Sequence, residues 1–138
     1  RCRQTAELLF PGMEQHIVPD LQECDFGDYE CKTWEELKDE EIYRAWIGGD
    51  MTITFPHGES MEHFIARCRR GIQTVAQEAK AMGLQRPAIV AHGGTWLVVM
   101  GTFGRPERKL YDWQVKNCGG FRVSVQENPF TLKLLEEL

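Results

Sequence analysis

A single histidine stands where an apolar run meets two glycines. Residues 88–91 read Ala-Ile-Val-Ala, and His92 is followed by Gly93 and Gly94. Imidazole can hydrogen-bond and carry charge near neutral pH, and glycine lets a ligand approach the backbone because it has no Cβ. A helix that begins after the glycines would add unpaired N–H groups that favour an anion. The spacing therefore predicts a phosphate-binding site at His92.

Two other segments carry groups that suit the same chemistry. Arg1 opens the stretch Arg-Cys-Arg-Gln-Thr-Ala, and Glu23 lies in an acidic loop that continues to Glu30. The plain alternatives are a histidine that only caps a core strand and a loop carboxylate in solvent. For His92, the placement of His-Gly-Gly between an apolar strand and a helix favours the functional interpretation.

These segments, in this order and spacing, resemble the histidine phosphatase superfamily with its phosphoglycerate-mutase-like fold. The likeness runs along nearly the whole chain and includes Pro-His-Gly-Glu-Ser at residues 56–60, which matches a Pro-x-Gly-Glu-Ser turn of the family. Within the superfamily, the chain is most similar to the cofactor-independent branch that includes α-ribazole phosphatase. The resemblance implies hydrolysis of a small phosphorylated metabolite, such as α-ribazole 5′-phosphate, through a phosphohistidine intermediate.

The resemblance also implies roles for individual residues. His92 would match the assisting histidine, which stabilises charge on the transferred phosphoryl group, and the N–H of Gly93 would add a donor. Arg1 would match an arginine of the phosphate pocket, because its planar fork of donors fits phosphate oxygens, with Arg3 a weaker candidate. Glu23 would be the general acid that protonates the leaving oxygen and later activates water.

Other acidic groups and one histidine need separate treatment. Asp25 and Glu30 share the loop of Glu23 and are rivals for the acid role. Glu59 is expected to order the turn before a long helix rather than to take part in chemistry. His57, in that same turn, is a candidate for contact with the leaving group.

The nucleophilic histidine of the family belongs to an Arg-His-Gly motif upstream of the segment that Arg1 begins. His16, His57 and His63 do not suit this role, because they fall on an exposed stretch, in the substrate-side turn and at a helix start. We therefore expect an N-terminally shortened chain that lacks the nucleophile and is inactive alone. An open sheet edge would favour either a homodimer that fills the gap or upstream residues supplied separately.

Three other functions compete with hydrolysis through phosphohistidine. A metal-dependent hydrolase would use His57, Glu59, Glu62 and His63, but this cluster is not His-Glu-x-x-His and has no evident third ligand, so no metal is expected. Mutase-type phosphoryl transfer is disfavoured by the acidic loop around Glu23. A non-catalytic protein that binds phosphorylated ligands would keep the same fold and site.

The composition narrows the partners of the chain. It has 138 residues, of which 42% are hydrophobic and 27% charged, as is usual for one globular domain. The net charge of −5 argues against a nucleic-acid partner. No apolar run approaches the roughly 20 residues that span a membrane. Five cysteines without a Cys-x-x-Cys pair favour a reducing cytoplasm over disulfides or zinc.

Helices alternating with short strands must position these groups. The pattern predicts an α/β three-layer sandwich, with a mostly parallel sheet, helices on both faces and its N-terminal strands absent. Residues 1–138 would form one domain with a lid-like insertion at about 30–58. We expect helices over residues 1–9, from the Thr33–Glu36 capping box to about 47, 60–82, from 95 onward and 106–113. We expect strands over residues 88–91 and 121–125, with a last short segment over 131–135.

The longest predicted helix has one apolar face. Ser60 is a good N-cap and Gly83 a good residue to follow the helix end. Arg67, Arg69 and Arg70 fall largely outside the apolar face, so we expect them on a solvated surface. The apolar positions at helical spacing are Phe64, Ile65, Cys68, Ile72, Val75, Ala76 and Ala79.

Overall fold

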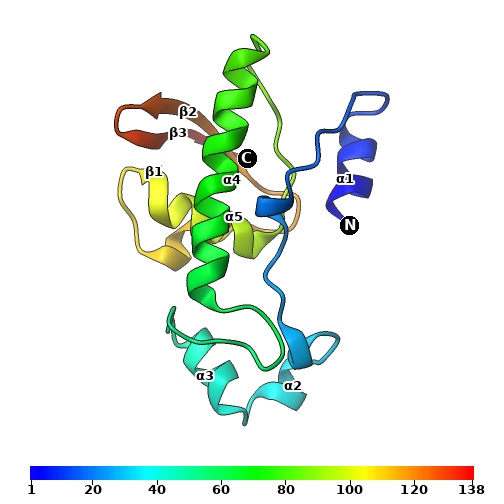
Figure 1. Cartoon of the computed structure of the whole chain (residues 1–138), viewed down its shortest axis with the longest axis vertical. Coiled ribbons are helices and arrows are strands. Elements are labelled where there is room, and N and C mark those ends of the chain that lie inside the picture. The colour runs from blue at the N-terminus through cyan, green and yellow to red at the C-terminus, as the bar shows by residue number, and fades with distance from the viewer. The chain divides into compact units, whose positions relative to one another are not determined.

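The computed structural model describes all residues from 1 to 138, and the chain forms two compact units. The first unit consists of residues 1–23 and 68–138, and the second consists of residues 24–67. The predicted insertion, residues 30–58, falls within the second unit. Figure 1 shows the elements from the N-terminus in blue to the C-terminus in red.

The first unit combines helices with a three-stranded sheet, so the α/β class is confirmed. Its sheet has the order β1-β3-β2. The β1–β3 pair is parallel over two residues, whereas β2 and β3 form a longer antiparallel hairpin, so parallel pairing is limited to the short pair. The elements are α1 (Cys2–Leu9), η1 (Pro19–Leu21), α5 (Gly93–Phe103), β1 (Gly104–Arg105), η3 (Leu110–Trp113), β2 (Phe121–Glu127) and β3 (Phe130–Glu137), with the later part of α4 (Met61–Ala81).

The predicted strand over residues 88–91 is wrong. The segment is not part of any strand, and it runs as an irregular stretch into α5. Pro87 and Ala88 are exposed, and Ile89 is half-buried. A strand exists only through its ladder with a neighbour, and no strand of this chain pairs with the segment. An apolar run of this length is therefore not sufficient to make a strand here.

The predicted helix over residues 106–113 is also wrong, because only the short turn η3 forms there. Lys109 has an extended backbone, and its N–H donates to the carboxylate of Asp112 at 3.3 Å. This local bond starts the helical turn only after Lys109.

Apolar side chains from α5, η3 and the hairpin form the core of the first unit. Val99, Met100 and Trp113 are almost fully buried, and Leu132 of β3 is 1% exposed. The ring of Phe103 meets that of Phe130 edge to face, with centroids 4.9 Å apart. Burial of each large side chain contributes about 1.5–3 kcal/mol, so these contacts fix α5 on the sheet.

The helix predicted over residues 60–82 is confirmed as α4, Met61–Ala81. The N–H of His63 donates to the Ser60 hydroxyl at 3.1 Å, which satisfies one of the unpaired donors at the helix start. Gly83 follows the helix with φ of +69°, a conformation that glycine adopts at low cost. Four predicted core residues of the helix are buried: Phe64, Cys68, Ile72 and Ala79.

The second unit contains two helices where the sequence predicts one. The expected capping box is present, since the N–H of Thr33 donates to the Glu36 carboxylate at 2.8 Å. However, α2 (Trp34–Leu37) ends early and α3 (Glu41–Ile47) begins after a break. The Arg44 guanidinium donates to the backbone oxygen of Asp39 at 2.6 Å, which stabilises the open turn between the two helices.

Five aromatic rings form the interior of the second unit. Phe26 packs on Phe55 at 5.1 Å and on Trp46 at 5.2 Å between centroids, in tilted or edge-to-face arrangements. Tyr29 and Tyr43 extend the cluster. Because these rings come from η2 (Gly27–Tyr29), α3 and the turn at residue 55, they join all three segments.

Two glycines let the backbone segments of the second unit interlock. A Cβ at Gly27 would lie 2.1 Å from the carbonyl oxygen of Pro56, and one at Gly58 would lie 2.5 Å from that of Asp25. Gly27 also has φ of +53°. Only glycine suits both the crowding and this backbone conformation.

Arg67 corrects another expectation, because it is buried rather than solvated. It is 4% exposed, and its guanidinium donates to both carboxylate oxygens of Glu59, at 2.7 and 2.8 Å. A buried guanidinium requires such a paired carboxylate. Arg69 and Arg70 are exposed, as expected.

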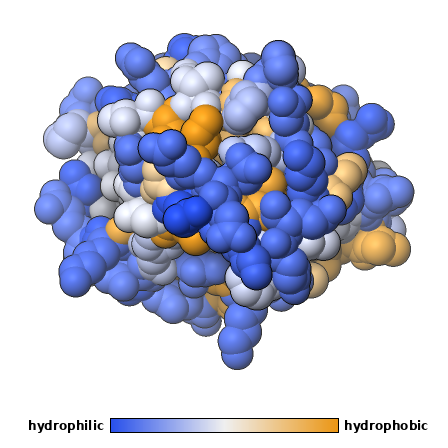
Figure 2. All heavy atoms as spheres, turned by 90° about the horizontal axis from the view of Figure 1, so that it is seen from below, coloured by the Kyte–Doolittle hydropathy of each residue, from blue (hydrophilic) through white to orange (hydrophobic).

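The surface of the chain is mixed in character. The face seen in Figure 2 is largely hydrophilic, with apolar atoms in separate patches. None of the helices has both the length and the apolar composition that crossing a membrane requires. The five cysteines form no disulfide.

Candidate functional site

The candidate site lies at the start of α5 in the first unit. His92 is the N-cap residue, with an extended backbone, and its carbonyl accepts the first helical bond from the Trp96 N–H at 3.1 Å. The N–H groups of residues 93–95 therefore precede the helical ladder and point out of the helix start. With the positive end of the helix dipole, they form a setting that favours an anion beside the imidazole.

Glu23 lies at the same helix start. Its carboxylate is pressed against Gly94, because a Cβ built on Gly94 would lie 2.5 Å from Glu23 Oε1. Both Glu23 and His92 are half-buried. The structure thus brings Glu23 to the turn that His92 caps, although the two residues are about seventy positions apart in sequence.

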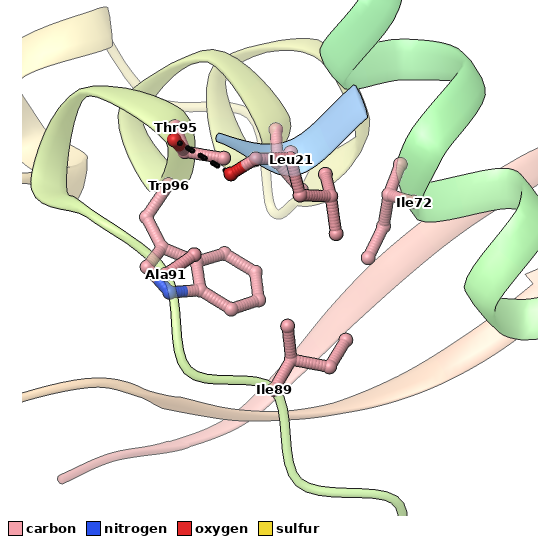
Figure 3. Close-up of a pocket in the computed structure, with 7 residues that line it drawn as sticks. Leu21, Ile72, Ile89, Ala91, Thr95 and Trp96 are labelled. Atoms are coloured by element: carbon pink, nitrogen blue, oxygen red, sulfur yellow. Dashed lines mark hydrogen bonds between the residues drawn. The ribbon is translucent and has the colours of Figure 1, made fainter. Parts of the chain in front are cut away.

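Two helices hold the backbone that precedes Glu23. The Thr95 hydroxyl donates to the carbonyl oxygens of Leu21 and Gln22, at 3.3 and 3.4 Å. On the other side, Gly71 of α4 leaves room for Leu21, since a Cβ there would lie 2.9 Å from Leu21 Cγ. Figure 3 shows η1 at Leu21 close to both α5 and α4. The segment that carries Glu23 is therefore held on two sides.

An apolar pocket lies beside Leu21, between residues of α4 and α5, and has a structural role. Leu21, Ile72, Ile89 and Trp96 are among the side chains that line it (Figure 3). It leaves no room for even a water molecule, so it is a packing seam rather than a ligand site.

The predicted arginines are not joined to Glu23 or His92. Arg1 is exposed and precedes α1, and Arg3 is exposed within that helix. The backbone oxygen of Arg1 accepts the N–H of Thr5 at 2.9 Å, and no hydrogen bond or ion pair links either guanidinium to the start of α5. Their predicted phosphate contacts remain a proposal.

His57 belongs to the second unit. Its Nδ1 lies 2.9 Å from a carboxylate oxygen of Asp28, and its side chain is 86% exposed. The backbone of His57 has φ of +53°, which is unusual for a residue with a side chain. The Asp28 N–H also donates to the Pro56 carbonyl at 2.9 Å, so two bonds hold this turn.

The rivals of Glu23 are engaged within their own loop. Asp25 accepts the N–H of Gly27 at 2.9 Å, and Glu30 accepts that of Phe26 at 3.1 Å. These bonds order the acidic loop locally. Of the three, Glu23 belongs to the first unit together with α5, whereas Asp25 and Glu30 belong to the second.

Glu59 is a structural carboxylate, as expected. Burial would raise its pKa, but hydrogen bonds from Arg67 and His63 and the charge of Arg67 lower the pKa to about 2. The Glu59 N–H donates to the backbone oxygen of Asp25 at 2.9 Å, which ties the turn to the acidic loop. With Glu59 held in this way, the side chains around His57 and His63 do not form a group of three or more metal-ligating residues.

Sequence reasoning misses two of the residues that build the site. The sequence marks Thr95 only as the beginning of an apolar helix, and Gly94 only as a glycine that lets a ligand approach the backbone. A threonine directly after the double glycine is only a weak signal of a special role. No rule that uses neighbouring residues predicts that its hydroxyl bonds the backbone of Leu21. Their roles appear only when η1 and α5 lie together.

A histidine and a carboxylate at the open end of a helix, within an α/β fold, define a protein suited to handling phosphoryl groups. Residues 1–138 match the family model of the histidine phosphatase superfamily (branch 1). The chain belongs to this superfamily.

Similar proteins carry related names. The adenosylcobalamin/alpha-ribazole phosphatase of Salmonella typhimurium is 30% identical over 140 residues, covering 98% of this chain and 68% of the relative. The alpha-ribazole phosphatase from Shigella flexneri matches with a TM-score of 0.72 and 27% identity, over 97% of this chain and 67% of that one. A phosphoglycerate mutase from Thermus thermophilus matches with a TM-score of 0.66 and 27% identity, over 100% and 67%.

Proposed function

We propose that the chain provides the acid and the assisting histidine of a phosphohistidine-type phosphomonoester hydrolase. The observation that carries the proposal is the seating of the Glu23 carboxylate at the helix start that His92 caps. The named phosphatases among its relatives support a small phosphorylated metabolite as substrate, with α-ribazole 5′-phosphate as the first compound to test.

The groups divide the work of the proposed reaction between charge stabilisation and proton transfer. The first N–H groups of α5, including that of Gly93, and the imidazole of His92 stabilise charge on the phosphoryl oxygens. The phosphoryl group passes from the substrate oxygen to a histidine nitrogen, and Glu23 gives its proton to that leaving oxygen. Glu23 then takes a proton from water, whose oxygen attacks phosphorus and releases phosphate. Arg1 and, more weakly, Arg3 would contact phosphate oxygens, and His57 the leaving group.

We further propose that none of the other histidines of the chain is the nucleophile. His16 is exposed beside Glu14, at 3.9 Å. His57 and His63 each direct Nδ1 to a carboxylate of their own unit. The chain alone is therefore expected to bind phosphate without turning over a phosphate ester.

Phosphate binding tests the site directly. Titration of the isotope-labelled chain with inorganic phosphate is expected to shift the amide resonances of Gly93, Gly94 and Thr95 in a nuclear magnetic resonance spectrum. The variant His92→Gln should bind at least about 10-fold more weakly, because a hydrogen bond to a charged group contributes about 1.5–3 kcal/mol. His16→Gln is the matched control and should retain wild-type affinity. Equal affinity in both variants would contradict the proposal.

An assay with p-nitrophenyl phosphate tests the missing nucleophile. No turnover is expected from the purified chain. Robust turnover that is lost in His57→Gln or His63→Gln would assign the nucleophile to one of these residues. Transfer of phosphate to a second substrate oxygen would favour mutase chemistry, which the similarity to a phosphoglycerate mutase makes the alternative. A third outcome would be phosphate binding with neither hydrolysis nor transfer, even when a segment carrying the nucleophilic histidine is added. That outcome would indicate a protein that only binds phosphorylated ligands.

Three broader proposals accompany this function. Residues 30–58 would act as a lid-like insertion of a single domain. The cysteine content supports a cytoplasmic location, and the net charge of −5 supports the absence of a nucleic-acid partner.

A homodimer is supported by the backbone of residues 88–91, which has no strand beside it. Light scattering after size exclusion should give about twice the monomer mass of 15.9 kDa at high concentration. A stable monomer at every concentration would rule the dimer out.

A further inference from the structure

We infer that Gly94 and Thr95 are positioning residues that together set the location of the Glu23 carboxylate. The inference rests on the proposed function for its catalytic meaning, but its structural content stands alone. Thr95 fixes the backbone before Glu23, and the missing side chain at position 94 leaves the space that the carboxylate fills.

The contact at Gly94 is specific to the acid. The three atoms closest to a Cβ built at this position all belong to Glu23: Oε1 at 2.5 Å, Cδ at 3.2 Å and Oε2 at 3.3 Å. A neighbouring glycine behaves differently, since a Cβ at Gly93 would meet nothing within 4 Å. Absence of a side chain is therefore required at 94 by the carboxylate itself.

The contact at Thr95 fixes the backbone directly before Glu23. Its hydroxyl is fully enclosed, because Thr95 is 1% exposed. It reaches two successive carbonyl oxygens, those of Leu21 and Gln22, directly before Glu23. Figure 3 shows the bond to Leu21. Consecutive residues of one helix turn thus hold the backbone and shape the seat of the acid.

A substitution at Gly94 can change the position of the Glu23 carboxylate without lowering the stability of the fold. A methyl group at 94 would press on the free end of a flexible side chain, which can rotate away without moving the backbone. Alanine is also better tolerated than glycine within a helix. Gly94→Ala should therefore keep or raise the thermal unfolding midpoint while it displaces the carboxylate.

The matched control is Gly101→Ala in the same helix. A Cβ at Gly101 would also meet the end of a flexible side chain, Cδ1 of Leu110 at 2.7 Å. The two variants add the same methyl group to one helix under similar crowding. Only the first variant faces Glu23.

The test follows the Glu23 carboxyl carbon by carbon-13 magnetic resonance, with the signal assigned by its loss in Glu23→Gln. The resonance should move in Gly94→Ala and stay in Gly101→Ala. It should also move in Thr95→Val, which removes the hydroxyl, and return in Thr95→Ser, which restores it. An unmoved resonance in Gly94→Ala, or an equal movement in Gly101→Ala, would overturn the inference.

This readout is independent of the proposed function. Phosphate affinity is measured on the same samples. If the wild type does not bind phosphate, the proposed function is wrong. The carboxyl resonance would still report whether Gly94 and Thr95 position Glu23. The two failures are therefore distinguishable.

Discussion

Two glutamates, Glu59 and Glu23, have very different surroundings in this chain. Glu59 is held by Arg67 and His63, and this pairing keeps it ionised and rigid. Glu23 lies instead at a helix start, against a glycine. The first carboxylate stabilises a turn, whereas the second lies at the helix start where we propose that phosphate binds.

The pairing of Glu59 predicts acid sensitivity. Its pKa is about 2 in the folded chain against an ordinary 4.5, so its contribution is complete above pH 4.5 and is lost as the pH falls toward 2. The contribution amounts to up to about 3 kcal/mol. Glu59→Gln should be less stable at pH 7 and lose less stability between pH 4.5 and 2, as measured by urea unfolding.

Glu62→Gln is the control for this measurement, since Glu62 is an exposed neighbour at the start of α4. It should follow the wild-type dependence on pH. If Glu59→Gln showed the same acid loss as the wild type, the pairing would not be the source of the sensitivity.

At the scale of elements, close contacts between loop backbones stabilise the second unit as its helices do. The segments around Gly27 and Gly58 pass so closely that neither position has room for a methyl group. Backbone bonds join the same segments, including Asp28 N–H to the Pro56 oxygen. This interlock holds the turn that carries His57.

Gly27→Ala should therefore be strongly destabilising. Its Cβ would meet backbone atoms, which cannot rotate away, and its φ of +53° disfavours alanine. Gly12→Ala is the control, because Gly12 has φ of +74° but nothing within 4 Å of a Cβ. Gly12→Ala should cost about 1–2 kcal/mol, and Gly27→Ala at least about 2 kcal/mol more. Equal unfolding free energies would refute the interlock.

At the scale of the molecule, stability is concentrated in two separate cores. The first unit is centred on Val99, Met100, Trp113 and Leu132, and the second on its aromatic cluster. Segments outside these cores, such as residues 84–92, have few backbone bonds. Local opening should follow this division.

Hydrogen exchange checks the division. At low protein concentration, where the chain is monomeric, the amides of residues 88–91 should exchange within the shortest measurable time, whereas those of β3 and the middle of α5 should be protected by orders of magnitude. Protection of residues 88–91 that rises with protein concentration would instead reveal pairing between copies.

Much of this molecule follows from local sequence rules. The helices α1, α4 and α5 lie close to their predicted positions, because caps and apolar periodicity act over a few residues. The family resemblance singles out Glu23 and His92, and the structure places both at the start of α5. The helices depend on residues close together in the sequence, and the two site residues are identified from the order of the family's motifs along the chain.

The failures arise from distant partners. The apolar segment at residues 88–91 could become a strand only beside another strand. The burial of Arg67 escapes prediction because its partner Glu59 precedes the helix and lies outside the apolar periodicity. The hydroxyl of Thr95 can be assigned only once η1 is placed on α5.

The tryptophans give the chain an internal set of optical reporters. Trp113 is 1% exposed in the first unit, whereas Trp34 is 61% exposed in the second. Trp46 lies among the rings of the second core, 5.6 Å from Phe55 between centroids. Emission from the buried indole should therefore lie at shorter wavelength than emission from the exposed one. Replacing Trp34 and Trp46 with phenylalanine would leave fluorescence that follows the melting of the first unit alone.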